Sequence, residues 1–224
     1  MLSTAMNVWR PALSQAVAPA GIITANRALW LAKGGASGAT WTDSSGNARN
    51  MTLVGAPTVG ATSVTFSGTG QYGTVAFTIG APMTICMRVK QVSWTAGRYL
   101  CAGATASTNH IRQASVSPQI QQDSATFDSA IGSVGGASVG ANASIVATYQ
   151  APGPAQNSVI SVNGTESAQD AFTVSDAAMA GFTLAAGSSV GLSPSNIEVT
   201  EVVVYSVALT APERAQMIAY LNTL

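Results

Sequence analysis

Two carboxylates near the C-terminal end, Glu198 and Glu201, are the first residues whose type and spacing could do chemistry. Hydrolysis of a glycosidic bond needs two carboxyl groups that flank the bond, about 5 to 9 Å apart. Side chains of an extended segment alternate between its two faces, so residues three apart point to opposite faces. We therefore expect that these two residues do not flank one bond, and the sequence predicts that the chain is not an enzyme.

The single histidine, His110, is the other residue that catalysis could use. The segment around it, HIRQ, contains neither a nucleophile turn nor a neighbouring acidic residue. A lone histidine is more often a polar side chain on a strand, and no catalytic residue is predicted.

The turn-forming segment DSSGN brings oxygen-bearing side chains together. Calcium takes about six to eight oxygen ligands. Asp43, Asn47 and Asn50 could supply some of these, and Asp123 and Asp128 others. The alternative, which we favour, is that Asp43 and Asn47 cap their own turn and need no ion. No other cofactor is predicted, because the two cysteines and the histidine lack the spacing of zinc ligands.

Sugar binding would use exposed aromatic rings that stack on sugar faces. Trp94, at the tip of an expected hairpin, and Tyr149, before a Pro-Gly-Pro loop, are the candidate glycan-binding residues. Trp30 and Trp41 lie in strand-like runs and are predicted to be core residues.

Composition narrows the possible partners. Charged residues make up 8% of the chain and the formal net charge is zero. A nucleic-acid binder normally carries a basic patch, so this class is excluded. A surface with so few charges suggests that neighbouring molecules in an assembly cover much of it. The alternative is a secreted domain rich in small residues.

No membrane span and no secretion signal are expected. No stretch approaches the roughly 18 consecutive apolar residues of a transmembrane helix. The N-terminal segment has an early Arg10 and lacks a sustained apolar run. We therefore expect synthesis in the cytoplasm, where cysteines stay reduced, and this agrees with Cys86 and Cys101 as two free thiols. A hairpin over residues 93–97 would place Cys101 opposite Val89, which favours two buried thiols over a disulfide.

The elements that must position these residues are mostly short strands. The clearest strand lies in 195–207 and is apolar on both faces, with Ile197, Val199, Val203, Tyr205 and Val207 on one face and Val202 and Val204 on the other. A helix follows, with Thr210 as its cap, Glu213 closing a capping box, and a stripe of Met217, Ile218 and Leu221. Asn163-Gly164 predicts a hairpin turn.

Residues 1–27 differ from the rest, with two prolines and no alternation. We expect an arm that becomes ordered by docking, with Trp9, Arg10 and Arg27 as candidate interaction residues; a first strand behind a frayed terminus is the equal alternative. Residues 28–224 form the predicted single domain.

Across that domain, an ordered series of motifs resembles the concanavalin A-like lectin/glucanase fold, in its laminin-G-like form. The residues that carry the resemblance are Trp41, Asp43, Ser45, Gly46, Asn47, Phe66, Gly68, Tyr72, Val75, Pro82, Thr84 and Ile85, followed by the C-terminal strand and helix. The resemblance implies an all-β, two-sheet antiparallel jelly-roll sandwich with an N-terminal arm and a short C-terminal helix. It also implies a structural role for Glu201. The Glu-x-Asp-x-x-Glu run of related glucanases does not occur here.

Jelly rolls of this kind, poor in charge and preceded by an arm, resemble virion proteins of tailed bacteriophages. The leading hypothesis is therefore a capsid decoration protein, made in the host cytoplasm, that binds the major capsid protein or other virion proteins as a homo-oligomer. The alternative is a carbohydrate-binding, lectin-like module that recognises host-surface glycans, and an enzyme ranks third.

Overall fold

The computed structural model describes residues 21–104, 108–124, 129–150, 158–168 and 178–224. The described chain is all-β with one C-terminal helix, which confirms the predicted fold class. Its elements are β1 (Arg27–Ser37), β2 (Thr40–Asp43), β3 (Met51–Val54), β4 (Thr58–Val59), β5 (Val64–Ser67), β6 (Tyr72–Ile79), β7 (Met83–Gln91), β8 (Tyr99–Gly103), β9 (His110–Gln113), β10 (Ile120–Ser124), β11 (Ser129–Val134), β12 (Asn142–Tyr149), β13 (Val159–Val162), β14 (Thr165–Glu166), β15 (Met179–Leu184), β16 (Asn196–Tyr205) and α1 (Ala211–Leu221).

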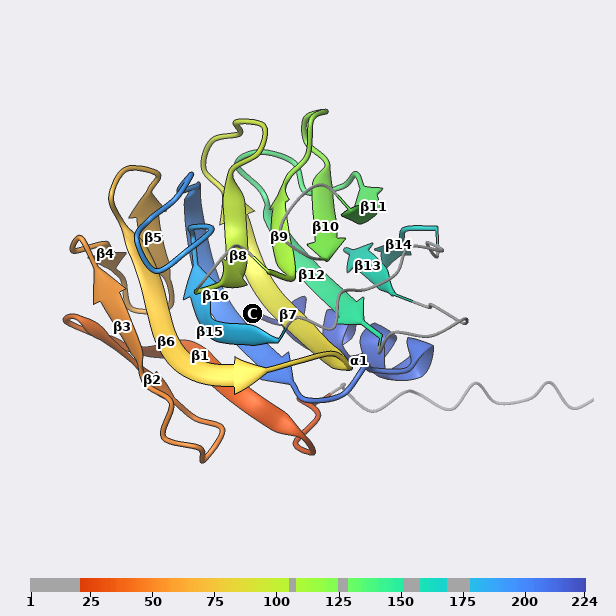
Figure 1. Cartoon of the computed structure of the whole chain (residues 1–224), viewed down its shortest axis with the longest axis horizontal. Helices are drawn as coiled ribbons and strands as arrows, with labels where there is room; N and C mark the ends of the chain where they lie inside the picture. The colour runs from red at the N-terminus through yellow and green to blue at the C-terminus, as the bar shows by residue number, and fades with distance from the viewer. Residues whose placement is uncertain (1–20, 105–107, 125–128, 151–157, 169–177) are drawn as a thin grey trace, which may run out of the picture.

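All strands except β4 and β5 form one hydrogen-bonded path that folds over on itself into two layers (Figure 1). β5 pairs with β16 and with β4. What we call the front layer has the order β11-β10-β9-β8-β15-β6-β3, and the back layer has the order β1-β16-β7-β12-β13-β14. β2 joins the two layers, since it pairs with both β1 and β3. All these pairs are antiparallel, as in a jelly-roll sandwich.

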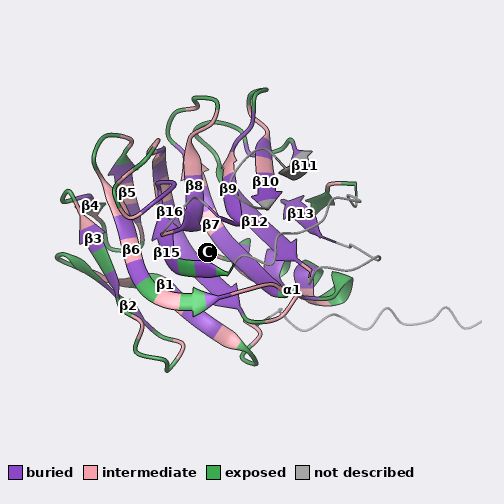
Figure 2. Cartoon of the chain, in the orientation of Figure 1, coloured by how far each residue is buried: buried purple, intermediate pink, exposed green. Residues whose placement is uncertain are grey.

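The main hydrophobic core lies between the layers. It joins Leu100, Ile111 and Phe182 of the front layer to Met87 and Ile145 of the back layer. Figure 2 shows that buried residues follow the strands, while exposed residues gather in the turns. Trp41 is a core residue, as predicted, and Trp30 is half-buried beside the second cluster described below.

The faces of β16 differ from the prediction. A β-bulge between Val199 and Glu201 shifts the register by one residue, and an extra residue moves every later side chain to the other face. Ile197, Val199, Val202 and Val204 consequently face the main core, and Val203 and Tyr205 face α1.

The bulge also places Glu198 and Glu201 on the same face of β16, because each alternates with a core-facing neighbour. The prediction that they point to opposite faces is wrong. Simple alternation holds only for a strand without an inserted residue.

Helix α1 covers the outer side of the back layer. Met217, Ile218 and Leu221 are buried there with Cys86 and Val146, as the predicted stripe requires. The Glu213 carboxylate accepts hydrogen bonds from the backbone N–H of Thr210 (2.8 Å) and from its hydroxyl (2.7 Å). The helix start is thus where the sequence placed it.

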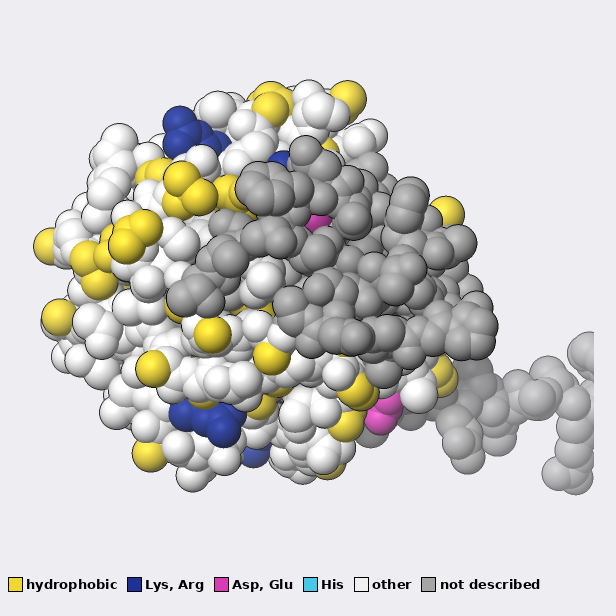
Figure 3. Space-filling view, viewed as in Figure 1, with side chains coloured by type: hydrophobic (Ala, Val, Ile, Leu, Met, Phe, Trp, Pro, Cys, Tyr) yellow, Lys and Arg dark blue, Asp and Glu magenta, His cyan; other side chains and the backbone are white. Residues whose placement is uncertain are grey.

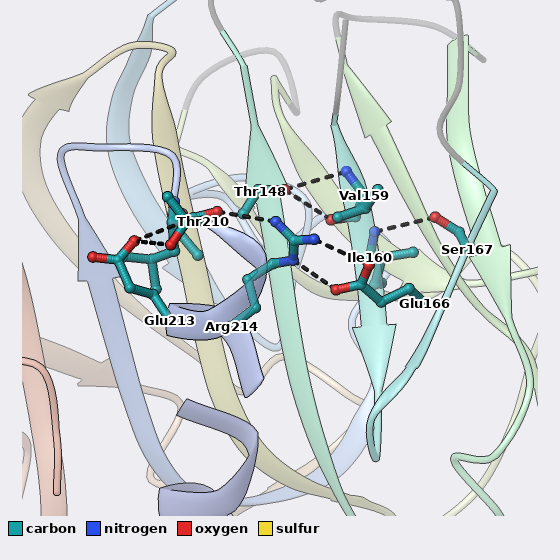
Figure 4. Close-up of polar contacts among 10 residues, drawn as sticks. Thr148, Val159, Ile160, Glu166, Ser167, Thr210, Glu213 and Arg214 are labelled. Carbon is teal, nitrogen blue, oxygen red and sulfur yellow. Dashed lines mark hydrogen bonds and ion pairs between the residues drawn. The ribbon is translucent and has the colours of Figure 1, made fainter. Parts of the chain in front are cut away.

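An ion pair joins the same helix to the edge hairpin (Figure 4). The Arg214 guanidinium donates to both oxygens of Glu166 on β14, at 2.7 and 3.0 Å, and to the Leu209 carbonyl at 3.0 Å. Arg214 is 6% exposed. Because two guanidinium nitrogens bind the carboxylate, the pair fixes the relative orientation of the two side chains as well as attracting them.

Two hairpin predictions had different outcomes. Asn163 and Gly164 connect β13 to β14 with φ angles of 52° and 90°, which confirms the turn. The predicted hairpin between the cysteine-bearing strands is wrong, because β7 pairs with β12 and β16 and β8 pairs with β9 and β15. The intervening turn crosses between layers instead. Both cysteines are buried and free, as favoured.

Trp9, Arg10 and the rest of residues 1–20 lie outside the described residues. β1 begins at Arg27, and Ile22 and Ile23 pack beside α1. The Tyr205 hydroxyl donates to the Ile23 carbonyl at 3.0 Å. The division into an arm and a domain at residue 28 stays a prediction. In the described part of the chain, no helix is long and apolar enough to cross a membrane.

Candidate functional site

A hollow of about 420 Å³ opens at the end of the front layer where β9 turns into β10. We call it the β9–β10 hollow. The segment that links β7 to β8 forms one wall, and polar side chains of β9 and β10 form the other. Its lining residues are Ala96, Gly97, Arg112, Gln113, Ser115 and Gln121.

A buried carboxylate, Asp123, holds two of these side chains in place. The Arg112 guanidinium approaches it with Nε 2.9 Å from Oδ2, and the Gln121 amide donates to Oδ1 at 2.6 Å. Asp123 is fully buried, whereas 19% of the Arg112 side chain is exposed. The contacts with Asp123 thus hold the Arg112 and Gln121 side chains in position at the wall of the hollow.

The pKa of Asp123 lies below its ordinary value. Burial on its own would raise the pKa, but the hydrogen bond and charge of His110, the Gln121 amide and the Arg112 charge outweigh it. The His110 Nε2 lies 3.1 Å from Asp123 Oδ2, and the Tyr99 ring meets the imidazole edge-on. Asp123 therefore stays a carboxylate, and its charge offsets that of Arg112.

Gln113 fixes the opposite wall. Its side-chain carbonyl accepts from the Thr95 N–H at 2.9 Å, and its amide donates to the Ser93 carbonyl at 2.9 Å and to Gln91 Oε1 at 2.7 Å. Gln113 is 1% exposed. The 92–98 segment is thereby tied to β9 on both sides of Trp94, which makes the hollow a built feature rather than a gap between mobile loops.

The pairing of His110 with Asp123 corrects the sequence analysis, which found no acidic partner near the histidine. β9 and β10 run antiparallel, with His110 directly opposite Asp123 and Arg112 opposite Gln121. Cross-strand neighbours of this kind lie within contact distance. The intervening ASVSPQ contains the turn-favouring pair Ser117-Pro118, but a turn alone does not specify which residues of the two strands lie opposite each other.

Neither predicted glycan-binding aromatic lines the hollow. Tyr149 is fully buried, and its hydroxyl donates to the His110 carbonyl at 3.0 Å. A ring without exposed surface cannot stack on a sugar, so this prediction is wrong; Tyr149 lies on β12, whose other interior residues are buried on both faces. Trp94 is half-buried in the 92–98 segment, and its indole N–H is buried without a partner among the described residues.

The candidate calcium ligands form a hydrogen-bonded turn. Asp43 Oδ1 accepts from the N–H groups of Trp30 (3.0 Å) and Ser45 (2.8 Å), and Oδ2 accepts from the Ser45 hydroxyl and the Arg49 N–H. The Asn50 side chain accepts from the Asp43 N–H at 3.0 Å. These contacts are those expected of the turn-capping alternative. Calcium binding stays a prediction.

Asn47 and Arg27 lie close to this turn. The Asn47 amide donates to the carbonyls of Arg27 (2.9 Å) and Ala28 (3.2 Å). Both Asn47 and Arg27 line a second hollow, which is described below. Of the other two proposed calcium ligands, Asp123 serves the β9–β10 hollow, and Asp128 lies outside the described residues.

The two C-terminal carboxylates have separate partners although they share a face. Glu201 is 1% exposed and accepts from the Trp30 indole (2.9 Å), the Lys33 N–H (3.1 Å) and the Tyr220 hydroxyl (2.6 Å). This is the structural role that the resemblance implied. Glu198 pairs with Lys90, which lowers its pKa.

Neither a family model nor a curated protein sequence matches the chain. Solved structures do share its fold. A Trypanosoma rangeli sialidase in complex with sialic acid aligns with a TM-score of 0.69 at 16% identity, over 91% of this chain and 34% of the sialidase. The receptor-binding domain of botulinum neurotoxin C/D mosaic serotype aligns with a TM-score of 0.63 at 10% identity, over 88% of this chain and 51% of that one. The type G domain gives 0.61 at 13% identity.

These likenesses establish a β-sandwich and correct one prediction. The expectation that the chain is not an enzyme is contradicted, because sialidases, which are enzymes, align with this chain over about a third of their own length. The argument from opposite faces also fails, because Glu198 and Glu201 share a face of β16. The chain spans about a third of the sialidase it matches and about half of the neurotoxin domains. The neighbours give no support for a capsid or bacteriophage role.

Proposed function

We propose that the chain is a lectin-like module that binds a glycan in the β9–β10 hollow. The observation that carries the proposal is the pair Arg112 and Gln121, held by buried Asp123 at the wall of a hollow of about 420 Å³. Guanidinium, amide and hydroxyl groups fixed in a concave site are the groups that recognise sugar hydroxyls.

The charges of the site favour a neutral sugar face. Arg112 is offset by Asp123, and no acidic side chain is among the described residues that line the hollow. On the face drawn in Figure 3, charged side chains lie in only a few separate places. Such a site offers directed hydrogen bonds to hydroxyl groups without a strong net field.

The fold neighbours support the class of function. One is a sialidase in complex with sialic acid, and two are receptor-binding domains of botulinum neurotoxins. The shared β-sandwich is compatible with sugar or receptor binding and does not specify the ligand, because one fold serves many functions. The location in a virion, the homo-oligomer and the capsid partner stay predictions of the sequence.

The test is a glycan array probed with the full chain, followed by calorimetric titration of the best sugar. Arg112→Met should weaken binding about tenfold or more, since it removes a fixed donor from the hollow. Ala96 is exposed at the rim, so Ala96→Trp should block the hollow without unpairing Asp123. Lys33→Met removes an exposed cation elsewhere and should bind as the unaltered chain does.

The proposal is overturned if no sugar binds, or if Ala96→Trp binds the selected sugar unchanged. Ala96→Trp is the decisive variant, because Arg112→Met leaves Asp123 buried with fewer partners and could lower stability on its own. Thermal unfolding of each variant separates loss of binding from loss of fold.

A further inference from the structure

A second hollow, of about 200 Å³, lies at the end of the sandwich where β1 begins. We call it the two-arginine hollow. Arg27 of β1 and Arg49, which precedes β3, both line it, together with Asn47, Thr78 of β6 and Ser206. The residues come from segments far apart in the chain, so the sandwich itself brings the two guanidinium groups to one cavity.

Aromatic rings hold both guanidinium groups. The guanidinium carbon of Arg27 lies 4.5 Å from the centre of the Trp30 ring, and that of Arg49 lies 4.7 Å from the centre of the Phe77 ring. Arg27 Nε donates to the Thr24 carbonyl at 3.2 Å, and Arg49 Nη1 donates to the Ala28 carbonyl at 2.8 Å. Stacking of this kind orients a guanidinium and leaves its remaining N–H groups for a ligand.

The hydrogen bonding of Arg27 is incomplete. Its Nη1 is buried and has no partner among the described residues. A buried donor without an acceptor costs free energy that an added acceptor would recover. The carbonyl acceptors nearby, those of Arg27 and Ala28, already receive the Asn47 amide.

Among the residues that the structure describes, the two arginines are not paired with a carboxylate, although Glu201 accepts from the indole N–H of Trp30, the ring on which Arg27 stacks. None of the described lining residues of the hollow is acidic, and neither arginine forms an ion pair within the described part of the chain. The two carboxylate oxygens of Asp43, on the neighbouring turn, already accept four hydrogen bonds, from three backbone N–H groups and the Ser45 hydroxyl. Residues 1–20 contain no Asp or Glu, so that segment has no acidic side chain to offer.

We propose that the two-arginine hollow is a binding site for a small oxyanion, or for the anionic group of a larger ligand. Two guanidinium forks match the oxygens of a sulfate, phosphate or carboxylate group. Asn47, Thr78 and Ser206 add polar groups at the rim. The site is separate from the β9–β10 hollow, and it does not depend on the proposed glycan function.

The test uses the full chain at constant ionic strength, because added salt screens exposed charges. Sulfate, phosphate and acetate are titrated separately against a chloride background and followed by calorimetry and by the fluorescence of tryptophan. Saturable binding is expected, with a fluorescence change because Arg27 stacks on Trp30. A preference for sulfate and phosphate indicates a tetrahedral anion, and a preference for acetate indicates a carboxylate.

Arg27→Met and Arg49→Met should each weaken binding about tenfold or more, since each removes charge-assisted hydrogen bonds. Lys33→Met is the control for loss of one positive charge and should bind normally. Arg49→Lys keeps the charge, loses the fork and should also bind more weakly, which covers the case in which Arg49→Met does not fold. Absence of saturable binding by all three anions overturns the proposal, and so does an equal loss of affinity in Lys33→Met.

Discussion

Single buried polar side chains organise much of this molecule. Asp43, Gln113, Asp123 and Glu201 are each less than 9% exposed, and each one bonds segments that are distant in the sequence or in the sheet. A buried polar group is tolerated only when it is hydrogen-bonded. Because hydrogen bonds are directional and apolar contacts are not, these residues fix how the segments they join are oriented.

Asp43 gives a prediction on pH dependence. Burial on its own would raise its pKa, but hydrogen bonds from the N–H groups of Arg49, Ser45 and Trp30 and from the Ser45 hydroxyl bring the pKa below its ordinary value of 3.8. A carboxylate with a lowered pKa in the folded state contributes stability above its unfolded pKa and loses it as the pH falls through the folded value. This part of the stability should therefore be present at neutral pH and disappear below about pH 4.

Asp43→Asn should lower the free energy of unfolding at neutral pH by about 1–3 kcal/mol, because an amide nitrogen cannot accept the hydrogen bonds of a carboxylate oxygen. The variant should also show a shallower loss of stability below about pH 4 than the unaltered chain does. Urea unfolding at a series of pH values measures both quantities. Parallel pH profiles for the two proteins would contradict the assignment.

At the scale of elements, turns and bulges decide which side chains meet. The segment 92–98, which carries Trp94, crosses from the back layer to the front layer instead of closing a hairpin. The bulge in β16 places Glu198 and Glu201 on one face. One inserted residue has this effect because the side-chain period of a strand is two. The same strand without the bulge would present Tyr205 to the core instead of to α1.

The β13–β14 turn allows a clean test of turn chemistry. Gly164 has a φ of 90°, and a Cβ placed there would meet nothing within 4 Å, so only the backbone conformation opposes a side chain. Gly164→Ala should cost about 1–2 kcal/mol of folding free energy, as expected for a left-handed backbone conformation. Gly135 is the matched control, because a Cβ there also meets nothing and its φ is not positive. Equal unfolding midpoints for the two variants would show that the turn relaxes without cost.

At the scale of the whole molecule, two apolar interfaces hold the sandwich together. One lies between the front and back layers and contains Cys101, and the other lies between the back layer and α1 and contains Cys86. No buried residue that the structure describes belongs to both clusters, so the two interfaces are separate. Partial opening of a protein commonly begins with a peripheral element, and α1 is such an element here.

The cysteines report on the two interfaces separately. Burial raises the pKa of Cys101 to about 12 and raises that of Cys86 further, so neither thiol should react with a thiol reagent at about pH 8 in the folded chain. A Cys101→Ala chain should then react through detachment of α1, and a Cys86→Ala chain only through separation of the layers. We expect faster labelling of the first in mild denaturant. Equal rates would mean that α1 leaves only when the whole domain unfolds.

The sequence by itself determined the all-β class, the C-terminal helix with its Thr210 and Glu213 start, the Asn163-Gly164 turn and the burial of both cysteines. These features depend on side-chain alternation, on the conformations that one or two residues allow, and on composition. Such information is local, and it is fully present in a short stretch of chain.

Only the tertiary structure decided the site. The register of β9 against β10 brought Asp123 to His110 and Arg112, the bulge turned Glu201 and Glu198 to one face, and packing between the layers buried Tyr149. The two-arginine hollow likewise joins Arg27 to Arg49 through the fold. The physical reason is that strand pairing and burial depend on contacts between segments far apart in the chain, which no local pattern of residues specifies.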